Sequence, residues 1–397
     1  MATFTHPFGT SELHRRPVSN GDLLLAWDAA DQLLLEEYAA GGDSGASVLV
    51  VNDSFGALAV ALRAQPVTSW SDSRTAHLAT ESNAEANGGA AITYARSTDQ
   101  PDSTYQAVLW RVPRSMDLLR WQAHILQKTL APGTRIWAAG MDKHLPDRTI
   151  DVLRLLGGVH LVPGRKKAHA FAIVTEAGPE VSLAPSPGYA VPEFGLDFEP
   201  APNVFGSGRL DAGSRLLAER LDQLPDAYRV ADLGAGTGVL GLVAQRVLPQ
   251  ATVHFYDESY QAVAAAEANY RKNIGDPADT SAEFFAADRM SVEPTELYDL
   301  VLCNPPFHQG HVVGDGVAWQ MFTNARESLR IGGQLWIVGN RHLEYHTKLA
   351  RLFSGVRQLA DHPKYVVLAA TRDAKPFVAV KRKKKTTKSP RSRPAPN

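Results

Sequence analysis

The sequence is nearly free of cysteine and of long apolar runs. Its 397 residues include one cysteine, Cys303, which cannot form an internal disulfide, so we expect a protein of the reducing cytoplasm. No apolar run approaches the roughly 18 residues that cross a bilayer, and residues 1–16 contain no apolar signal core. Hydrophobic residues make up 44% and charged residues 21%, the profile of a globular protein, and the length favours two domains.

Net charge is also almost absent, at −1, but the charge is unevenly spread. Residues 381–397 carry eight of the 41 Lys and Arg residues and no acid, so the remainder has 33 bases against 42 acids. We expect an acidic folded body and a disordered basic tail. Such a tail either adds salt-dependent attraction to phosphates or is solvated without a partner.

The tetrapeptide Asn304-Pro305-Pro306-Phe307 follows a short apolar run, residues 298–303, that is typical of a buried parallel strand. In open α/β sheets, ligands collect outside the carboxyl ends of such strands. Two consecutive prolines stiffen the turn. The Asn304 side-chain oxygen and the Pro305 carbonyl then offer two acceptors to a planar NH2 group on a base, and Phe307 offers a ring to stack on it. Taken alone, the tetrapeptide is equally well explained as a turn.

The two halves of the chain repeat one another. Four segments of the first half recur in the same order in the second half, which predicts a duplicated α/β domain. The matched pairs are 71–73 with 257–259 (each followed by two asparagines, Asn83 and Asn87, or Asn269 and Asn273), 105–109 with 298–302, 130–140 with 329–339, and 158–159 with 355–356.

The copies differ where chemistry is expected. The first copy keeps Gly56 of the loop glycines and has Arg111-Val112-Pro113-Arg114 in place of residues 304–307. We interpret it as a retained fold that has lost its site and serves as a recognition surface. Arg111, Arg114 and the cluster at 165–167 are candidate phosphate contacts, with scattered surface charge as the alternative.

The predicted domains are residues 1–176 and 203–380, joined by a linker at 177–202 that is rich in Pro, Gly and Ser and includes an extended edge strand. Apolar spacing predicts a helix over residues 23–38. In the second domain, Asp211 either caps a helix running through Leu224 or helps to close a cofactor pocket.

Residues 229–248 form a strand, a loop with Gly234, Gly236 and Gly238, and an apolar helix, as in Rossmann-like nucleotide-binding domains. The dinucleotide pattern requires glycine where Val239 stands. Asp232, two residues before the loop, would repel a pyrophosphate but attract a cationic sulfonium amino acid.

Further acids follow the next two predicted strands. Asp257 lies where a carboxylate grips ribose hydroxyls, and Asp288 is placed to accept from an adenine amino group. Each acid alone is explained as a cap or turn residue. Together with Asn304 they indicate S-adenosylmethionine as the cofactor.

The chain resembles class I S-adenosylmethionine-dependent methyltransferases. Within them it is similar to the bacterial ribosomal RNA guanine-N2 methyltransferases built from a degenerate and an active copy, and most similar to those of the large subunit. The resemblance rests on segments along most of the chain, at 25–31, 51–58, 210–214, 257–259, 301–309, 317–322 and 339–343.

This resemblance implies two tandem Rossmann-like domains, the first degenerate and the second catalytic, and transfer of a methyl group to N2 of a guanine in 23S ribosomal RNA. It assigns the glycine loop, Asp257 and Asn304 to the cofactor, Asp288 to adenine, and the motif at 304–307 to catalysis, with Asn304 and Pro305 holding the amine.

We expect direct in-line transfer without a covalent intermediate, and no general base is evident. No metal is expected, because the pair His308 and His311 has no matching carboxylate or thiol pair. The alternatives are methylation of small-subunit RNA, of adenine N6 or of a protein glutamine, a non-catalytic RNA-binding assembly factor, and a nicotinamide-dependent dehydrogenase.

Overall fold

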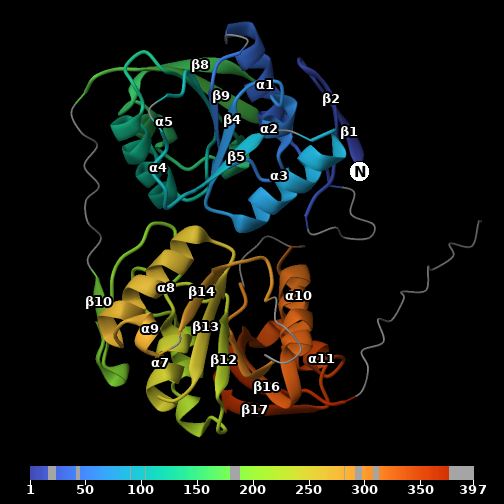
Figure 1. Ribbon diagram of the computed structural model, residues 1–397, viewed down its shortest axis with the longest axis vertical. Coiled ribbons are helices and arrows are strands. Elements are labelled where there is room, and N and C mark those ends of the chain that lie inside the picture. The colour runs from blue at the N-terminus through green and yellow to red at the C-terminus, as the bar shows by residue number, and fades with distance from the viewer. Residues whose placement is uncertain are drawn as a thin grey trace, which may run out of the picture.

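The computed structural model shows two α/β domains stacked along the long axis of the molecule (Figure 1). It describes residues 1–16, 24–41, 45–89, 91–102, 104–178, 188–280, 282–290, 297–306 and 313–374, without the side chains of 313–315. The basic tail, Phe307, His308 and His311 lie outside these residues. Among the helices in the described ranges, none is long and apolar enough to cross a membrane.

The amino-terminal domain is built on a seven-stranded sheet with the strand order β5-β4-β3-β6-β7-β9-β8, preceded by a β1–β2 hairpin. Its strands are β1 (Ala2–His6), β2 (Gly9–Leu13), β3 (Val48–Val51), β4 (Val67–Ser71), β5 (Ile92–Arg96), β6 (Ala107–Arg111), β7 (Arg135–Met141), β8 (Gly157–Arg165) and β9 (Ala168–Thr175). Its helices are α1 (Ala29–Gly41), α2 (Ala57–Ala61), α3 (Arg74–Ala86), α4 (Met116–Thr129) and α5 (Thr149–Leu153).

The carboxyl-terminal domain has a second seven-stranded sheet, of order β14-β13-β12-β15-β16-β18-β17, and a β10–β11 hairpin. Its strands are β10 (Tyr189–Val191), β11 (Leu196–Phe198), β12 (Arg229–Leu233), β13 (Thr252–Asp257), β14 (Glu283–Ala286), β15 (Tyr298–Cys303), β16 (Leu329–Asn340), β17 (Gly355–Asp361) and β18 (Tyr365–Thr371). Its helices are α6 (Ala212–Ala218), α7 (Val239–Val247), α8 (Tyr260–Asn273), α9 (Pro277–Thr280), α10 (Val313–Ser328) and α11 (Tyr345–Leu349).

The two sheets have the same topology, which confirms the predicted duplication. In each sheet the first five strands are parallel, and the penultimate strand in the spatial order is antiparallel to both of its neighbours. Each sheet is covered on both faces, because its buried side chains form two separate apolar clusters. The carboxyl ends of the central strands therefore form the open edge where a ligand can bind.

Two of the predicted helices are shorter in the structure. Helix α1 begins at Ala29 and not near residue 23, because the carboxylate of Asp28 accepts from the N–H of Ala30 and caps the helix there; Leu24 is 57% exposed. Helix α6 ends at Ala218, and a separate 3₁₀ turn covers Leu221–Gln223 on the way to residue 224.

The asparagine pairs of the repeat attach a hairpin to each domain. In the first domain, Asn87 exchanges two hydrogen bonds with the backbone of Glu12, and Asn83 does the same with His14. In the second domain, Asn273 binds both backbone groups of Asp197 in the same way. The predicted edge strand within 177–202 is instead this separate β10–β11 hairpin, which packs on the carboxyl-terminal core.

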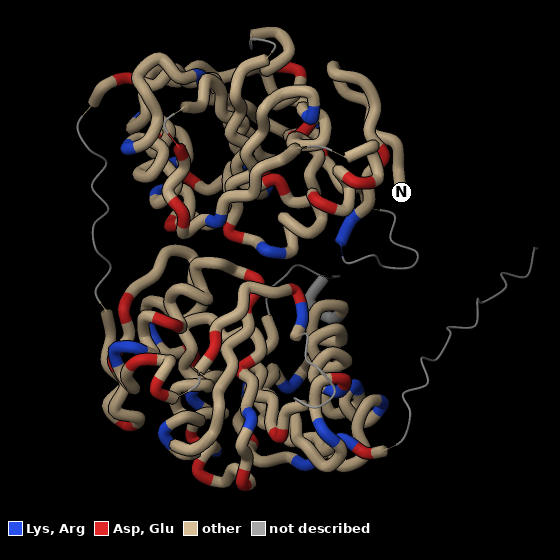
Figure 2. Tube along the Cα trace, in the orientation of Figure 1, with Lys and Arg blue, Asp and Glu red and all other residues tan. Residues whose placement is uncertain are grey.

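The carboxyl edges of the two sheets face each other. The backbones at Ser73, after β4, and Ser259, after β13, pair in an isolated antiparallel bridge. Arg74 N donates to Glu258 O at 2.8 Å, and Tyr260 N donates to Asp72 O at 2.9 Å. Acidic and basic residues are spread over both domains (Figure 2). Because the carboxyl edges of the two sheets face each other, the candidate site of the second domain opens toward the first domain.

Candidate functional site

The predicted site residues lie at the ends of four adjacent strands. Among these neighbouring strands, β13 ends at Asp257, and β14, β12 and β15 are followed by Asp288, the glycine loop and Asn304, respectively. Positions separated by up to 70 residues in sequence are thus brought to one sheet edge. Pro305 is buried and Pro306 is exposed, while Phe307 lies outside the described residues.

The glycine loop requires residues without side chains. Gly234, Gly236 and Gly238 have φ values of 75°, 54° and 83°. A Cβ on Gly236 would lie 3.1 Å from the carbonyl oxygen of Phe205, and a Cβ on Gly238 would lie 3.2 Å from Cβ of Ala266. The loop is therefore held at positive φ and closely covered, which is the geometry that brings backbone against a ligand.

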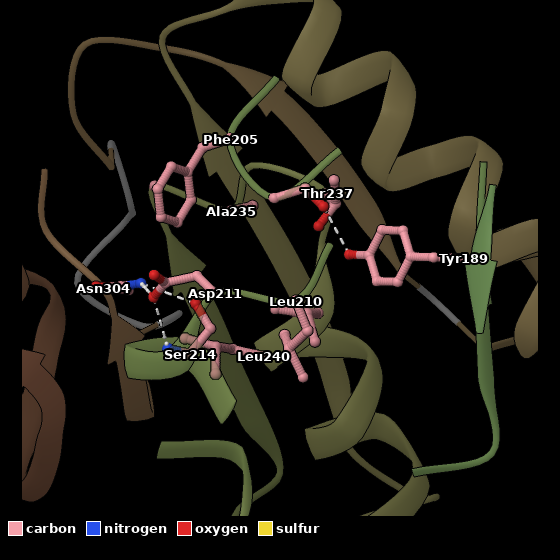
Figure 3. Close-up of a pocket in the computed structure, with 12 residues that line it drawn as sticks. Tyr189, Phe205, Leu210, Asp211, Ser214, Ala235, Thr237, Leu240 and Asn304 are labelled. Atoms are coloured by element: carbon pink, nitrogen blue, oxygen red, sulfur yellow. Dashed lines mark hydrogen bonds between the residues drawn. The ribbon is translucent and has the colours of Figure 1, made fainter. Parts of the chain in front are cut away.

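A small pocket lies between this loop and Asn304 (Figure 3). Figure 3 shows Phe205, Asp211 and Asn304 on one side of the pocket and Tyr189 and Thr237 on the other. The full lining is Tyr189, Phe205, Gly206, Leu210, Asp211, Ser214, Gly234, Ala235, Thr237, Val239, Leu240 and Asn304.

The amide of Asn304 is held in one orientation. Its Nδ2 donates to Ser214 Oγ at 2.8 Å and to Asp211 Oδ2 at 3.3 Å. Since a carboxylate only accepts, the nitrogen must face Asp211. Oδ1 of Asn304 is buried and has no hydrogen-bond partner within the described part of the chain. A buried acceptor without a donor is costly, so this oxygen fits a ligand NH group.

Asp211 lies at the start of a helix and in the wall of a pocket, the two places considered from the sequence. As the N-cap of α6, it accepts from Ser214 N at 3.0 Å, and it also lines the pocket beside Asn304. Ser214 was not among the predicted site residues. Its position three residues after a cap indicated a helix start but gave no sign of a contact with Asn304.

Asp257 is fixed at the end of β13. Its Oδ2 accepts from Gly236 N at 2.9 Å and its Oδ1 from Ser259 N at 3.0 Å. Burial raises the pKa of Asp257, and these backbone donors oppose that shift. Each carboxylate oxygen retains a second lone pair, so the side chain can still accept from ribose hydroxyls.

Asp232 lies beneath the loop and is 1% exposed. Its Oδ2 accepts from Gly241 N of α7 at 2.8 Å, and its Oδ1 has no partner among the described residues. Burial raises the pKa of Asp232 to about 7, with a smaller effect from the charge of Asp257. It lies outside the pocket lining, so it could act on a cation only through its field.

Asp288 is paired with a residue of the other domain. Nε and Nη2 of Arg16 donate to its Oδ2 at 3.2 and 2.8 Å. Arg16 was not predicted as part of the site. Its sequence neighbourhood, His14-Arg15-Arg16, contains no signal of a contact with a residue 272 positions away.

The corresponding edge of the first domain is closed by its own side chains. Gly56 caps α2 at φ 82°, as Gly238 caps α7 at φ 83°. Three residues before Gly56, the carboxylate of Asp53 accepts from the N–H groups of residues 56, 57, 58 and 59. This carboxylate occupies the helix N-terminus that an anionic or polar ligand would otherwise use.

Arg111 is paired with acids of its own domain, which argues against the predicted phosphate contact. Strand registers match Val51 with Trp110 and Leu233 with Cys303, so Arg111 stands where Asn304 stands in the second domain. Its guanidinium binds both oxygens of Asp28 at 2.7 and 3.0 Å and Asp31 at 2.9 Å, inside the fold. The sequence does not show that these acids surround Arg111.

Cys303 is a free, buried cysteine. Burial raises the pKa of its thiol well above the ordinary value, so little reactive thiolate is present at neutral pH. Among the described residues, no group of three or more His, Cys, Asp or Glu side chains is arranged to hold a metal ion.

Two family models match the chain. One, the RLMG N-terminal domain, matches residues 1–176, and the other, the Methyltransferase small domain, matches residues 195–369.

Several relatives match along nearly their whole length. The ribosomal RNA large subunit methyltransferase G of Ectopseudomonas mendocina is 44% identical over 383 residues, which cover 94% of this chain and 100% of that protein. The proteins of the same name from Pseudomonas entomophila and Pseudomonas aeruginosa are 42% and 41% identical, each over 93% of this chain and 100% of their own.

Among solved structures, the 16S rRNA N2 G1207 methyltransferase of T. thermophilus, in complex with AdoMet and guanosine, is similar with a TM-score of 0.74. The match covers 94% of this chain and 97% of that chain at 22% identity. At this level of identity, the similarity establishes the two-domain fold.

Proposed function

The chain belongs to the ribosomal RNA large subunit methyltransferase G family, and on this premise we propose that it methylates the exocyclic N2 of a guanine in 23S ribosomal RNA, using S-adenosylmethionine. It is an S-adenosylmethionine-dependent methyltransferase by family, and we place it in the cytoplasm, where its single buried thiol stays reduced.

Oδ1 of Asn304, which has no hydrogen-bond partner among the described residues, carries the proposal. Asp211 and Ser214 take both hydrogens of the Asn304 amide nitrogen, so its oxygen is directed away from them as an acceptor. The amine of guanine N2 supplies a matching donor. A hydrogen bond from this amine to Oδ1, with a second to the Pro305 carbonyl, favours a pyramidal nitrogen whose lone pair is free to attack.

The cofactor contacts that we propose lie in the pocket and at the strand ends beside it: Gly234 and Asn304 line the pocket, whereas Asp257 and Asp288 lie outside its lining. We assign the backbone of the Gly234–Gly238 loop to its amino-acid part, Asp257 to its ribose, Asp288 to its adenine, and Asp232 to its positive charge through the field. The cofactor supplies an electrophilic methyl group. The protein contributes by positioning the two reactants. The N2–methyl bond forms as the carbon–sulfur bond breaks, and N2 then gives up its extra proton to solvent, so the scheme requires no general base or metal.

We assign RNA recognition to the amino-terminal domain, residues 1–176, and catalysis to residues 203–380. Asp53 and the Arg111 cluster fill the first domain's own strand ends, which leaves it a binding function rather than a chemical one. A guanine within stacked RNA cannot reach a pocket of this kind, so the target base must be splayed out or single-stranded.

The test is methylation of ribosomal RNA from cells that lack the enzyme. Wild-type protein and Asn304→Ala are each incubated with labelled S-adenosylmethionine and separated 23S and 16S RNA, and the products are identified by nucleoside mass spectrometry. We expect 2-methylguanosine in 23S RNA with wild-type protein and almost none with the variant. Product in 16S RNA alone, or N6-methyladenosine, would refute the proposed substrate, and equal labelling by both proteins would refute the assigned role of Asn304.

A further inference from the structure

The two domains meet through a reciprocal pair of side-chain contacts. Ser259 Oγ of the second domain donates to Asp72 Oδ2 at 2.8 Å, and Ser73 Oγ of the first domain donates to Glu258 Oε2 at 2.5 Å. Asp72 and Glu258 are matched positions of the sequence repeat, as are Ser73 and Ser259. The junction is therefore a pseudo-two-fold contact between the same corner of each copy.

Only one of these two carboxylates is buried. Asp72 is 8% exposed, whereas the side chain of Glu258 is exposed to solvent. Asp72 also accepts from Ser97 Oγ of its own domain at 2.7 Å and from Gln261 N of the other domain at 2.9 Å. Since Tyr260 N donates to its backbone oxygen, Asp72 binds three successive residues of the carboxyl-terminal domain.

These three residues, 259–261, form the start of α8. Ser259 is the N-cap of this helix, and its Oγ also accepts from Ala262 N. Asp72 thus acts as a second cap supplied by the other domain, satisfying N–H groups that a helix leaves without intrahelical partners. The orientation of the Ser259 side chain depends on both of its hydrogen bonds, the one to Asp72 and the one from Ala262 N.

The same residue holds the carboxylate assigned to the cofactor ribose. Ser259 N donates to Asp257 Oδ1 at 3.0 Å, and Asp257 Oδ2 in turn accepts from Gly236 N in the glycine loop. A continuous chain of hydrogen bonds therefore runs from Asp72 in the first domain through Ser259 and Asp257 to the loop. Asp72 itself is outside the pocket lining.

A second contact reaches the neighbouring strand end. Both bonds from Arg16 go to Oδ2 of Asp288. Oδ1 lies 3.8 Å from Nε of Arg289, an ion pair beyond hydrogen-bond distance, so it can accept from another donor such as an adenine amino group. Arg16 lies two residues after His14, whose backbone N–H and C=O are both bound by Asn83 of α3. The guanidinium is therefore anchored on the amino-terminal domain.

We propose that the amino-terminal domain is part of the cofactor site, with Asp72 positioning Asp257 through Ser259 and Arg16 positioning Asp288 directly. This inference rests on the proposed function, because it takes Asp257 and Asp288 as S-adenosylmethionine contacts. It extends the role of the degenerate copy beyond RNA recognition. Loss of the contacts that the amino-terminal domain supplies impairs cofactor binding even when no RNA is present.

The test is calorimetric titration of the full-length protein with S-adenosylmethionine in the absence of RNA. We expect Asp72→Ala to weaken binding about tenfold, the scale on which partners of ligating groups act. Asp72→Asn should recover most of the affinity, since its amide can accept from Gln261 N and donate to Ser259 Oγ. Asp151→Ala, which removes an exposed carboxylate of the same domain, is the matched control and should bind as wild type.

A double-mutant cycle separates positioning from general destabilisation. If Asp72 acts through Asp257, the tenfold loss should shrink to less than about twofold in an Asp257→Ala background. Arg16→Ala should likewise weaken binding in the wild-type background and have little effect beside Asp288→Ala. Should Asp72→Ala fail to fold, Ser259→Ala tests the same link, because it removes the Oγ contact and retains the N–H that binds Asp257.

Two results would overturn the inference while leaving the proposed function intact. One is unchanged cofactor affinity in Asp72→Ala and Arg16→Ala. The other is an equal loss in both backgrounds, which is the signature of a destabilised fold. A wild-type protein that does not bind S-adenosylmethionine would overturn the proposed function, and the inference with it.

Discussion

Ser214 Oγ accepts a 2.8 Å hydrogen bond from Nδ2 of Asn304 and, with Asp211, sets the direction of the Asn304 amide. Ser214→Ala removes the shorter of these two bonds. One hydrogen bond of this kind contributes about 1 kcal/mol, so we expect kcat to fall several-fold, and up to about tenfold, as the amide loses its fixed orientation. Single-turnover methylation of 23S RNA measures the effect.

The affinity for S-adenosylmethionine should change less than the rate, because Ser214 acts through Asn304. Ser354→Ala, at an exposed serine of the same domain, is the control and should keep wild-type turnover. If Ser214→Ala also turns over at the wild-type rate, Asp211 alone is enough to orient the amide.

Arg111 should contribute to stability rather than to RNA binding. Arg111→Met leaves the Asp28 and Asp31 carboxylates without their shared cation, and Asp31 is buried. Breaking such a cluster on one side costs about 2–4 kcal/mol in the free energy of unfolding. Urea denaturation at neutral pH measures the loss, and Arg114→Met, at an exposed position, should stay within about 0.5 kcal/mol of wild type.

RNA affinity of the folded Arg111→Met protein should equal that of wild type. A variant of unchanged stability with much weaker RNA binding would instead restore Arg111 as a phosphate contact.

The sequence was sufficient for features that depend on neighbouring residues. The glycine spacing, the apolar strands and the repeated segments each lie within a few residues of one another, and the structure has the loop, the sheets and the duplication that they indicate. The four strand ends could be expected at one sheet edge, because adjacent parallel strands expose their carboxyl ends on the same edge.

Contacts between residues far apart in the chain could not be predicted from local sequence patterns. Arg111 and Asp28 are 83 positions apart, Asn304 and Ser214 are 90 apart, and Ser259 and Asp72 are 187 apart. An arginine buried between two acids looks the same in sequence as one on the surface. The start of α1 was misplaced for a related reason, since apolar spacing extends before Asp28 in the sequence while the capping bond from Ala30 N to Asp28 starts the helix at Ala29.

The turn at Lys166 and Lys167 is the more suitable place for RNA contacts. Both side chains are exposed, and the hydrogen bond from Asp142 N to Lys167 O places the turn at the carboxyl end of β7, on the sheet edge that faces the catalytic domain. Replacing both lysines by alanine should weaken RNA binding and lower the slope of log affinity against log salt by roughly 1.5. Cofactor affinity in the absence of RNA should not change.

Filter binding or fluorescence anisotropy over a range of salt concentrations measures that slope. Arg154→Ala is the matched control, because Arg154 is exposed and lies near the start of β8 at the opposite sheet edge. An unchanged salt slope in the double variant would exclude this turn from the RNA-binding surface.

Asp232 should make the protein less stable at alkaline than at mildly acidic pH. Burial raises its pKa to about 7 in the folded state, whereas an exposed carboxyl in the unfolded chain titrates near 3.9. Between these values the folded protein holds a proton that the unfolded chain has released. The contribution of this group to stability therefore falls as pH rises through that window, and above pH 7 the fold must retain a buried charge.

Asp232→Asn removes that charge and keeps an oxygen to accept from Gly241 N, which at present binds Oδ2. We expect the variant to exceed wild type in the free energy of unfolding by roughly 2–4 kcal/mol at pH 8, with the difference disappearing toward pH 4. Urea denaturation across this range tests the sign of the stability difference.

Binding of S-adenosylmethionine should weaken in the same variant, because the positive cofactor loses a nearby negative field. A variant less stable than wild type at pH 8 would mean that the carboxylate is stabilised by a partner and is not isolated beneath the loop.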